Sequence, residues 1–186
     1  MKRLFVAARI DPGKKFFDRL HALENQLKHE RIKWVEDHNV HITLKFFGET
    51  EERKIPEINN ILLSVAGKIA PFDLSLQKLG IFGSSYNPKV VWVGIEPYEG
   101  LVSIMKLMQD ELKRIGYEPD RQNLVPHLTL GRIKFLKDKQ LFQRSLDQYR
   151  DLSSQVMNVS SYLLFESILR KEGPIYLSLQ SFPFKI

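Results

Sequence analysis

The chain has 186 residues, of which 43% are apolar, so residues 1–186 can bury one core as a single domain or as two lobes that share it. Cysteine is absent, which excludes disulfides, thiol catalysis and cysteine-based zinc sites. The net charge of +6 favours an anionic partner such as RNA or a nucleotide.

The apolar runs of the sequence are too short for a signal peptide or for a membrane span. The opening MKRLFVAAR has a basic head, but the apolar run before Arg9 is too short for a signal peptide. No segment approaches the roughly 18 apolar residues of a membrane span. The sequence therefore predicts a cytoplasmic protein.

Strands and helices alternate through the first half of the chain. Apolar spacing predicts a strand, then a helix that begins near Asp11-Pro12 and ends near His29, then two strands, a second helix and a fourth strand, which is half-buried. The predicted strands are 3–10, 32–35, 40–47 and 72–77, and the second helix is 51–70.

The second half repeats this alternation. A turn-rich loop is predicted over 80–88, and its Phe82 and Tyr86 either stack on a base or pack the loop onto the body. The remaining predicted elements are a central strand 90–95, a helix 101–115, a polar connection 117–126, a helix 139–152, a long strand region 156–169, a hairpin turn 171–174 and a last strand 175–182. Because hairpins are frequent, the expected class is α+β with mostly antiparallel sheets.

Two matching tetrapeptides stand out, His41-Ile42-Thr43-Leu44 and His127-Leu128-Thr129-Leu130. Both lie in strand-forming runs, VHITLKFF and LVPHLTLGRI. Side chains alternate between the two faces of a strand. Each tetrapeptide therefore offers one imidazole and one hydroxyl on a polar face, backed by an apolar face that anchors in a core.

The surroundings of the tetrapeptides repeat as well. His127 follows His41 by 86 positions (127 − 41), and the same offset places residues 4–8 on residues 90–94, both short apolar strands. A repeated unit of strand, helix and His-x-Thr strand predicts two lobes related by a pseudo-two-fold axis. Such symmetry brings the two polar faces together across one cleft.

Two facing imidazoles are suited to acid–base chemistry without a metal or cofactor. An unperturbed pKa near 6.5 lets one histidine be protonated and the other neutral around neutral pH. The threonine hydroxyls can hold a phosphate between them, which suits the opening of a cyclic phosphodiester. His-Glu-x-x-His, phosphate-loop and Gly-x-Ser-x-Gly motifs are absent. His21 and His29 are expected at the solvated edge of the first helix. His38 is expected in a surface loop, with a place at the mouth of the cleft as the alternative.

At this point the chain resembles the 2H phosphoesterase superfamily, which is named for two His-x-Thr/Ser motifs. Within it, the chain is similar to bacterial and archaeal RNA 2′,3′-cyclic phosphodiesterases, historically called 2′-5′ RNA ligases (LigT-like proteins). The matching segments are RLFVAARI, NVHITLKFFGE, VVWVGI, VPHLTLGRIK and LFESILRKEGPIYLSL. The resemblance implies that His41 is the general acid and His127 the general base, with Thr43, Thr129 and Arg132 binding phosphate.

The resemblance also implies a bilobal fold, in which two mostly antiparallel sheets line a central cleft and helices lie outside. It implies hydrolysis of RNA 2′,3′-cyclic phosphate ends to 2′-phosphates, with reversible 2′-5′ ligation of tRNA halves as a side activity. We expect the protein to be a monomer. Two alternatives stay open: a 2H enzyme acting on a small cyclic nucleotide or another phosphoester, and a non-catalytic RNA-binding module.

Overall fold

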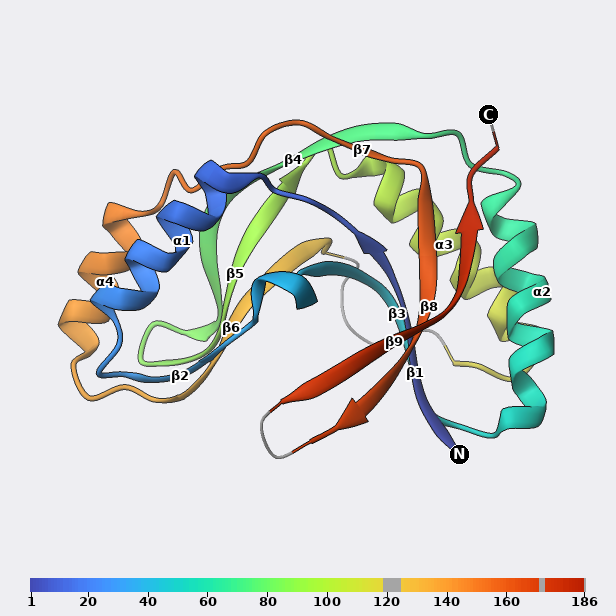
Figure 1. The fold of residues 1–186 in the computed structure, drawn as a ribbon, viewed down its shortest axis with the longest axis horizontal. Helices are drawn as coiled ribbons and strands as arrows, with labels where there is room; N and C mark the ends of the chain where they lie inside the picture. Colours follow the sequence, from blue (N-terminus) through green and yellow to red (C-terminus); the bar gives the residue numbers. More distant parts are fainter. Residues whose placement is uncertain (119–124, 171–172, 186) are drawn as a thin grey trace.

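The computed structural model describes residues 1–118, 125–170 and 173–185, and these form two antiparallel sheets (Figure 1). The first sheet has the strand order β3 (His41–Thr50), β1 (Lys2–Arg9), β8 (Ser161–Leu169) and β9 (Pro174–Pro183). The second has the order β2 (Arg31–Trp34), β6 (His127–Phe135), β5 (Asn87–Glu96), β4 (Phe72–Ser84) and β7 (Met157–Val159).

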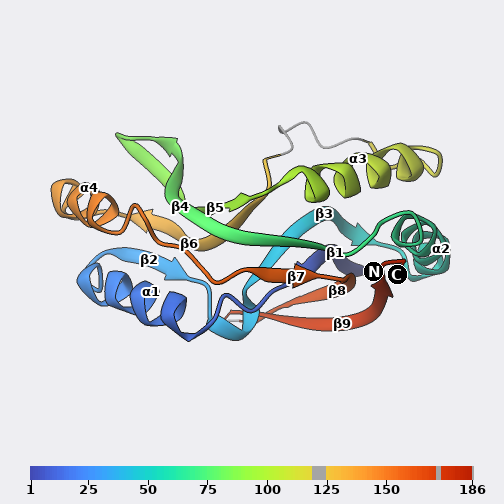
Figure 2. The same cartoon turned by 90° about the horizontal axis from the view of Figure 1, so that it is seen from above.

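The helices lie in two pairs at opposite ends of the molecule (Figures 1 and 2). The pairs are α1 (Lys14–Gln26) with α4 (Lys139–Gln148), and α2 (Ile55–Ala66) with α3 (Glu99–Lys113); short 3₁₀ turns cover Asp37–Asn39 (η1) and Glu52–Lys54 (η2). Gln26 donates to Gln148 in the first pair, at 3.2 Å. Across the described residues, no helix combines the length and apolarity that a membrane crossing needs.

Each sheet combines strands from both halves of the chain. The carboxy-terminal strands β8 and β9 extend the sheet that begins with β3 and β1, whereas the amino-terminal strand β2 pairs with β6 at the edge of the other sheet. Two antiparallel sheets with helices at their outer sides confirm the predicted α+β class. The exchange of strands means that neither half buries its own apolar faces alone.

The predicted loop over 80–88 is wrong, because this segment is a β-hairpin. Strand β4 continues to Ser84 and pairs with β5, so only the tip around Tyr86 is a turn, which projects from the body (Figure 2). Gly80 is needed for packing rather than for a turn, since a Cβ there would lie 2.6 Å from the Trp92 ring. Gly83 has φ +100° beside an irregularity in the register.

Other predicted boundaries also change. The long strand over 156–169 is two strands in different sheets, β7 and β8, which separate at Ser160. Helix α1 begins at Lys14 rather than at Asp11, because Gly13 has φ +84° and donates its N–H to Asp11 Oδ1 at 3.0 Å. Helix α2 starts only after the η2 turn. The predicted connection 117–126 and turn 171–174 fall partly outside the described residues.

The core confirms the apolar faces of the two histidine strands. Ile42, Leu44, Leu128 and Leu130 are all at most 3% exposed, and they pack in one cluster with alternate residues of the central strands β1 and β5. On β1 these are Leu4, Val6 and Ala8, and on β5 they are Val91, Val93 and Ile95.

The repeat is displaced by one residue from the alignment that the tetrapeptides suggested. Ala7 pairs with Thr43 and Trp92 pairs with Thr129, so the central strands correspond at 85 positions (92 − 7) rather than 86. A shift of one residue reverses the face on which every side chain lies. The 86-residue alignment would have matched core positions of β1 with outward positions of β5.

Tyr162 offers a test of how strand β8 is fixed to helix α2. Its side chain is fully buried, and its hydroxyl donates to the carbonyl oxygen of Leu62. Tyr162→Phe should lower the free energy of unfolding by about 1 kcal/mol, because a buried hydrogen bond is lost without a change in shape. Urea unfolding at 25 °C measures the change. Tyr86→Phe is the control, since Tyr86 is 82% exposed; equal losses would contradict the assignment.

Candidate active site

Strand β3 positions the first motif. His41 and Thr43 are half-buried on one face, while Ile42 and Leu44 enter the core on the other, as the alternation predicts. Arg9 is the register partner of His41 and Ala7 that of Thr43. Residues paired in this way bring their side chains together on the same face of a sheet. Strand β1 thus places a guanidinium beside the first imidazole.

Strand β6 repeats this arrangement in the second sheet. His127 and Thr129 are half-buried, and their register partners on β5 are Gly94 and Trp92. In both motifs the pairing with the central strand shifts immediately after the threonine, between Thr43 and Lys45 and between Thr129 and Gly131. The two sheets therefore present their histidines through the same local irregularity.

The two imidazoles are held by the same hydrogen bond. His41 Nδ1 lies 2.6 Å from the carbonyl oxygen of Asn39, and His127 Nδ1 lies 2.8 Å from that of Val125. A carbonyl oxygen only accepts, so in each ring Nδ1 carries the proton. The neutral form of each ring therefore has its lone pair on Nε2.

Burial lowers the pKa of both histidines. It lowers the pKa of His41, with a further contribution from the Arg9 guanidinium, and the hydrogen bond to Asn39 opposes this only in part. Burial likewise lowers the pKa of His127, and the Arg132 guanidinium acts in the same direction. An anion bound close to either ring would oppose this lowering of its pKa.

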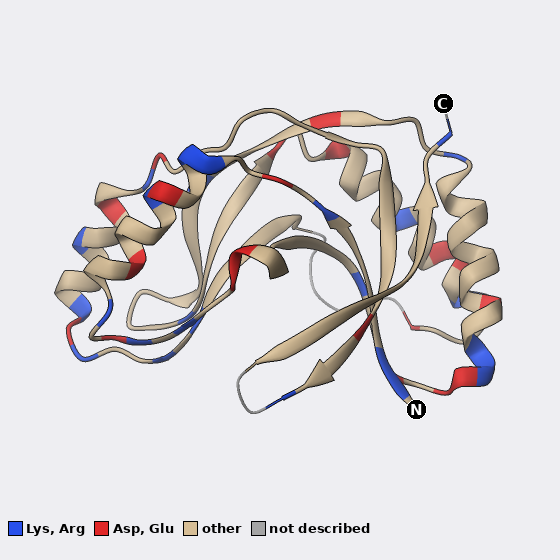
Figure 3. Cartoon of the chain, in the orientation of Figure 1, with Lys and Arg blue, Asp and Glu red and all other residues tan. Residues whose placement is uncertain are grey.

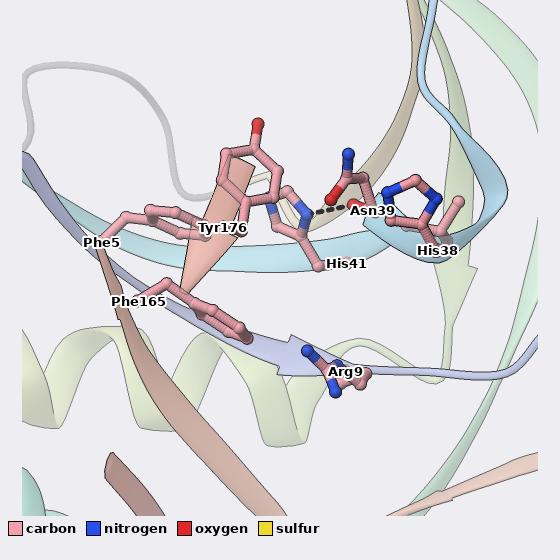
Figure 4. A pocket seen from close by; sticks show the side chains of 8 residues that line it. Phe5, Arg9, His38, Asn39, His41, Phe165 and Tyr176 are labelled. Atoms are coloured by element: carbon pink, nitrogen blue, oxygen red, sulfur yellow. Dashed lines mark hydrogen bonds between the residues drawn. The ribbon is translucent and has the colours of Figure 1, made fainter. Parts of the chain in front are cut away.

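A pocket of about 320 Å³ opens beside His41 (Figure 4). The Phe5 ring lies 5.1 Å from the His41 ring and stacks on Phe165, and Tyr176 meets His41 edge-on at 5.2 Å. The pocket is lined by Phe5, Arg9, His38, Asn39, Val40, His41, Phe165 and Tyr176. Aromatic walls of this kind suit a planar ring such as a nucleobase.

The surroundings of His127 differ. Phe82 meets the His127 ring edge-on at 4.7 Å and stacks on Trp92 at 5.1 Å. Of the two readings for the aromatics of the 80–88 segment, packing onto the body therefore holds for Phe82. Tyr86 is exposed at the hairpin tip, away from this contact. The structure thus gives the two histidines unequal neighbours in spite of the repeat.

An arginine lies near each of the two histidines. Lys and Arg are otherwise spread over strands, helices and loops together with acidic residues (Figure 3). Arg132 is exposed on β6, and its charge acts on His127 and also on Tyr176, which contacts His41 from the other sheet. Among the described residues, no carboxylate forms an ion pair with Arg132 or with Arg9.

The structure brings all five sequence-predicted site residues onto these two faces, and it adds residues that sequence reasoning missed. Arg9 had one usable signal, its place in the alternation of Phe5, Ala7 and Arg9 along a strand. Tyr176 and Phe165 had none, because only the sheet places them beside His41. Within the described part of the chain, no group of three or more His, Asp or Glu side chains is arranged to hold a metal ion.

The arrangement can bind an anion and move two protons. Each motif presents an imidazole and a threonine hydroxyl on one face of its sheet, with Arg9 beside the first imidazole and Arg132 near the second. The pocket beside His41 does not include His127, and the link between the two faces is the charge of Arg132, which acts on both His127 and Tyr176. No side chain of the described residues hydrogen-bonds the hydroxyl of Thr43 or Thr129. A negatively charged group bound there would favour protonation of a neighbouring imidazole, since opposite charges stabilise each other.

The state of the imidazoles can be measured directly. In an NMR titration of the free protein, His41 and His127 should both protonate with midpoints below 6.5, because burial disfavours the charged form. Above those midpoints, the nitrogen shifts should report the tautomer with the proton on Nδ1. His41→Gln and His127→Gln identify the two sets of resonances. A midpoint above 6.5 for either ring would contradict this description.

Known proteins are similar in sequence to this chain over most of its length. A family model described as LigT like Phosphoesterase matches twice, over residues 10–92 and 93–176. Two archaeal relatives are named RNA 2′,3′-cyclic phosphodiesterase. The Methanocaldococcus jannaschii protein is 36% identical over 174 residues, covering 94% of this chain and 96% of that protein. The Methanothermobacter thermautotrophicus protein is 31% identical over 182 residues, covering 97% of each.

Solved structures show the same fold. A crystal structure from Thermus thermophilus has a TM-score of 0.80 at 24% identity and covers 98% of both chains. The E. coli LigT structure complexed with 3′-AMP has a TM-score of 0.72 at 20% identity, covering 100% of this chain and 99% of that one. Together with the paired His-x-Thr motifs, the family match shows that the chain belongs to the LigT-like 2H phosphoesterases, a family of enzymes.

Proposed function

We propose that this protein hydrolyses RNA ends that carry a 2′,3′-cyclic phosphate, leaving a 2′-phosphate. The observation that supports this most directly is the matched pair of imidazoles, each anchored through Nδ1 with Nε2 left for proton transfer. The names of the relatives that cover nearly the whole chain support the substrate. Arginines beside both histidines favour a phosphate.

The reaction needs two proton transfers on opposite sides of phosphorus. The oxygen of water attacks phosphorus, and His127 Nε2 accepts its proton. The bond from phosphorus to the 3′ oxygen breaks, and protonated His41 donates its Nε2 proton to that oxygen. The 2′ ester remains, so the products are a 2′-phosphate and a free 3′-hydroxyl. Both proton transfers use imidazoles, so this scheme requires no metal.

The unequal surroundings of the histidines support this division of roles. The 3′ oxygen stays attached to the nucleoside, so the general acid should stand on the side where the nucleoside binds. The aromatic pocket lies beside His41, whereas Phe82 and Trp92 pack against His127. The cyclic phosphate would then raise the pKa of His41 from its lowered value and supply the protonated form.

The hydroxyls and guanidinium groups bind the phosphate in this scheme. Thr43 and Thr129 each follow their histidine by two residues and therefore lie on the same face of the strand. From there their hydroxyls can donate to the non-bridging oxygens of the phosphate. Arg132 and Arg9 balance the charge that grows on these oxygens as water attacks. Arg9 adds to the predicted set of site residues.

The same geometry accommodates ligation. A 5′-hydroxyl of a second RNA, such as the other half of a cleaved tRNA, can replace water as the attacking group. The product is then a 2′-5′ phosphodiester, and the step is reversible because no other group is released.

Two alternative functions fit the site less well. A small cyclic nucleotide would leave the surface beyond the first pocket unused, and a binding module would have no use for two open Nε2 atoms. We place the enzyme in the cytoplasm, acting as a monomer.

Both histidines should be required. His41→Ala and His127→Ala should each lower turnover of an oligonucleotide ending in 2′,3′-cyclic phosphate by about 10²–10⁴-fold, the usual contribution of a general acid or base. Circular dichroism checks that the variants fold, and His29→Ala, on an exposed histidine, is the matched control. Turnover with a chelator should equal turnover without it. Near-normal rates for either variant would overturn the two-histidine scheme.

Replacement of the 3′ oxygen by sulfur distinguishes acid from base. A thiolate leaves without prior protonation, so a 3′-thio cyclic substrate should restore most of the activity that His41→Ala loses. The same substrate should leave His127→Ala impaired, since water still needs a base. The ratio of thio to oxygen turnover, measured for each variant, gives the answer. The reverse pattern would exchange the two assignments.

A further inference from the structure

A second pocket adjoins the one beside His41. Its volume is about 200 Å³, and it shares His38, Asn39 and Tyr176 with the first pocket. Its other lining residues are Glu36, Arg170, Gly173, Pro174 and Ile175. The two pockets therefore form one track that leads from His41, past the η1 turn, to the start of strand β9.

The walls of this second pocket combine a cation with an apolar surface. Arg170 is exposed, and no carboxylate of the described residues forms an ion pair with it. Ile175 is 48% exposed and lies next to Pro174. The one acidic wall, Glu36, lies 3.3 Å from His38 Nε2 and accepts from Asn39 Nδ2 at 3.5 Å.

We propose that this second pocket binds the nucleotide on the 5′ side of the cyclic end, with Arg170 contacting the phosphate that links the last two nucleotides. The substrate class is then an oligonucleotide of at least two residues rather than a cyclic mononucleotide. This inference rests on the proposed function, and it adds a binding site to it.

The direction of the track follows from the chemistry of the first site. With the cyclic phosphate at the two histidines and the terminal nucleoside in the first pocket, the strand must leave through its 5′ phosphate. The second pocket continues the first through three shared residues, so it lies on that exit. Ile175 and Pro174 provide apolar surface for a ribose or base, and a guanidinium binds phosphate through paired donors.

Arg170 lies outside the two His-x-Thr motifs. It directly follows strand β8 of the first sheet, and the paired strand β9 brings Tyr176 to the same pocket. Its role would be to bind the extended substrate, without contact to the reacting phosphorus. Loss of Arg170 should therefore act on substrate length preference and on KM rather than on kcat.

The test compares two substrates, a cyclic mononucleotide and a dinucleotide that ends in the same cyclic phosphate. For the wild-type protein, kcat/KM should be about tenfold higher for the dinucleotide, the effect of one charged hydrogen-bonded contact. Arg170→Ala should reduce the ratio of the two kcat/KM values to near one. Arg144→Ala, on an exposed arginine of helix α4, is the control and should keep the wild-type ratio.

The ratio separates this inference from the proposed function. If both substrates are hydrolysed equally by the wild-type protein, or if Arg144→Ala lowers the ratio as much as Arg170→Ala does, the second nucleotide site is wrong while the proposed function stands. If the wild-type protein hydrolyses neither substrate, the proposed function itself fails, and the assignment of the second pocket fails with it.

Discussion

The site depends on the register between each histidine strand and the central strand beside it. Ile42 and Leu44, and likewise Leu128 and Leu130, are buried against alternate residues of β1 and β5, and this burial decides which face each motif presents. A slip of one residue would place both histidines in the core and four apolar side chains in water. Burial of one apolar side chain is worth roughly 1.5–3 kcal/mol, so the register is strongly favoured.

The two His-x-Thr motifs are nearly identical in sequence, but the neighbouring strands place different side chains beside the two histidines. Arg9 stands beside His41, where the second sheet has Gly94 beside His127. Phe46 and Arg132 occupy matching places, 86 positions apart (132 − 46), and exchange an aromatic ring for a cation. In the proposed mechanism one ring acts as the acid and the other as the base, and these different neighbours distinguish the two positions.

Burial and the Nδ1 hydrogen bond have opposite effects on the pKa of each imidazole: burial lowers it and the hydrogen bond raises it. Removal from water disfavours the charged imidazole, and the Nδ1 hydrogen bond to a backbone carbonyl fixes the tautomer and the direction of Nε2. In the free enzyme both rings are therefore oriented by their anchors, and burial lowers the pKa of each. In the proposed mechanism, the anionic substrate would favour protonation of one ring, which would couple binding to the start of the reaction.

The sequence by itself determined the features that depend on local periodicity. The faces of His41 and His127, the anchoring apolar residues and the order of strands and helices all follow from alternation within a few residues. Tertiary structure decided the rest. Phe5, Phe165 and Tyr176 meet at His41 only because β1, β8 and β9 are neighbours in one sheet. From the sequence, Gly80 and Gly83 are interpreted as signs of a loop, although they lie in strand β4. Gly80 is needed because the Trp92 ring packs against it, and that contact is not visible in the sequence. Contacts between strands distant in the chain leave no periodic signal, and they form the pocket.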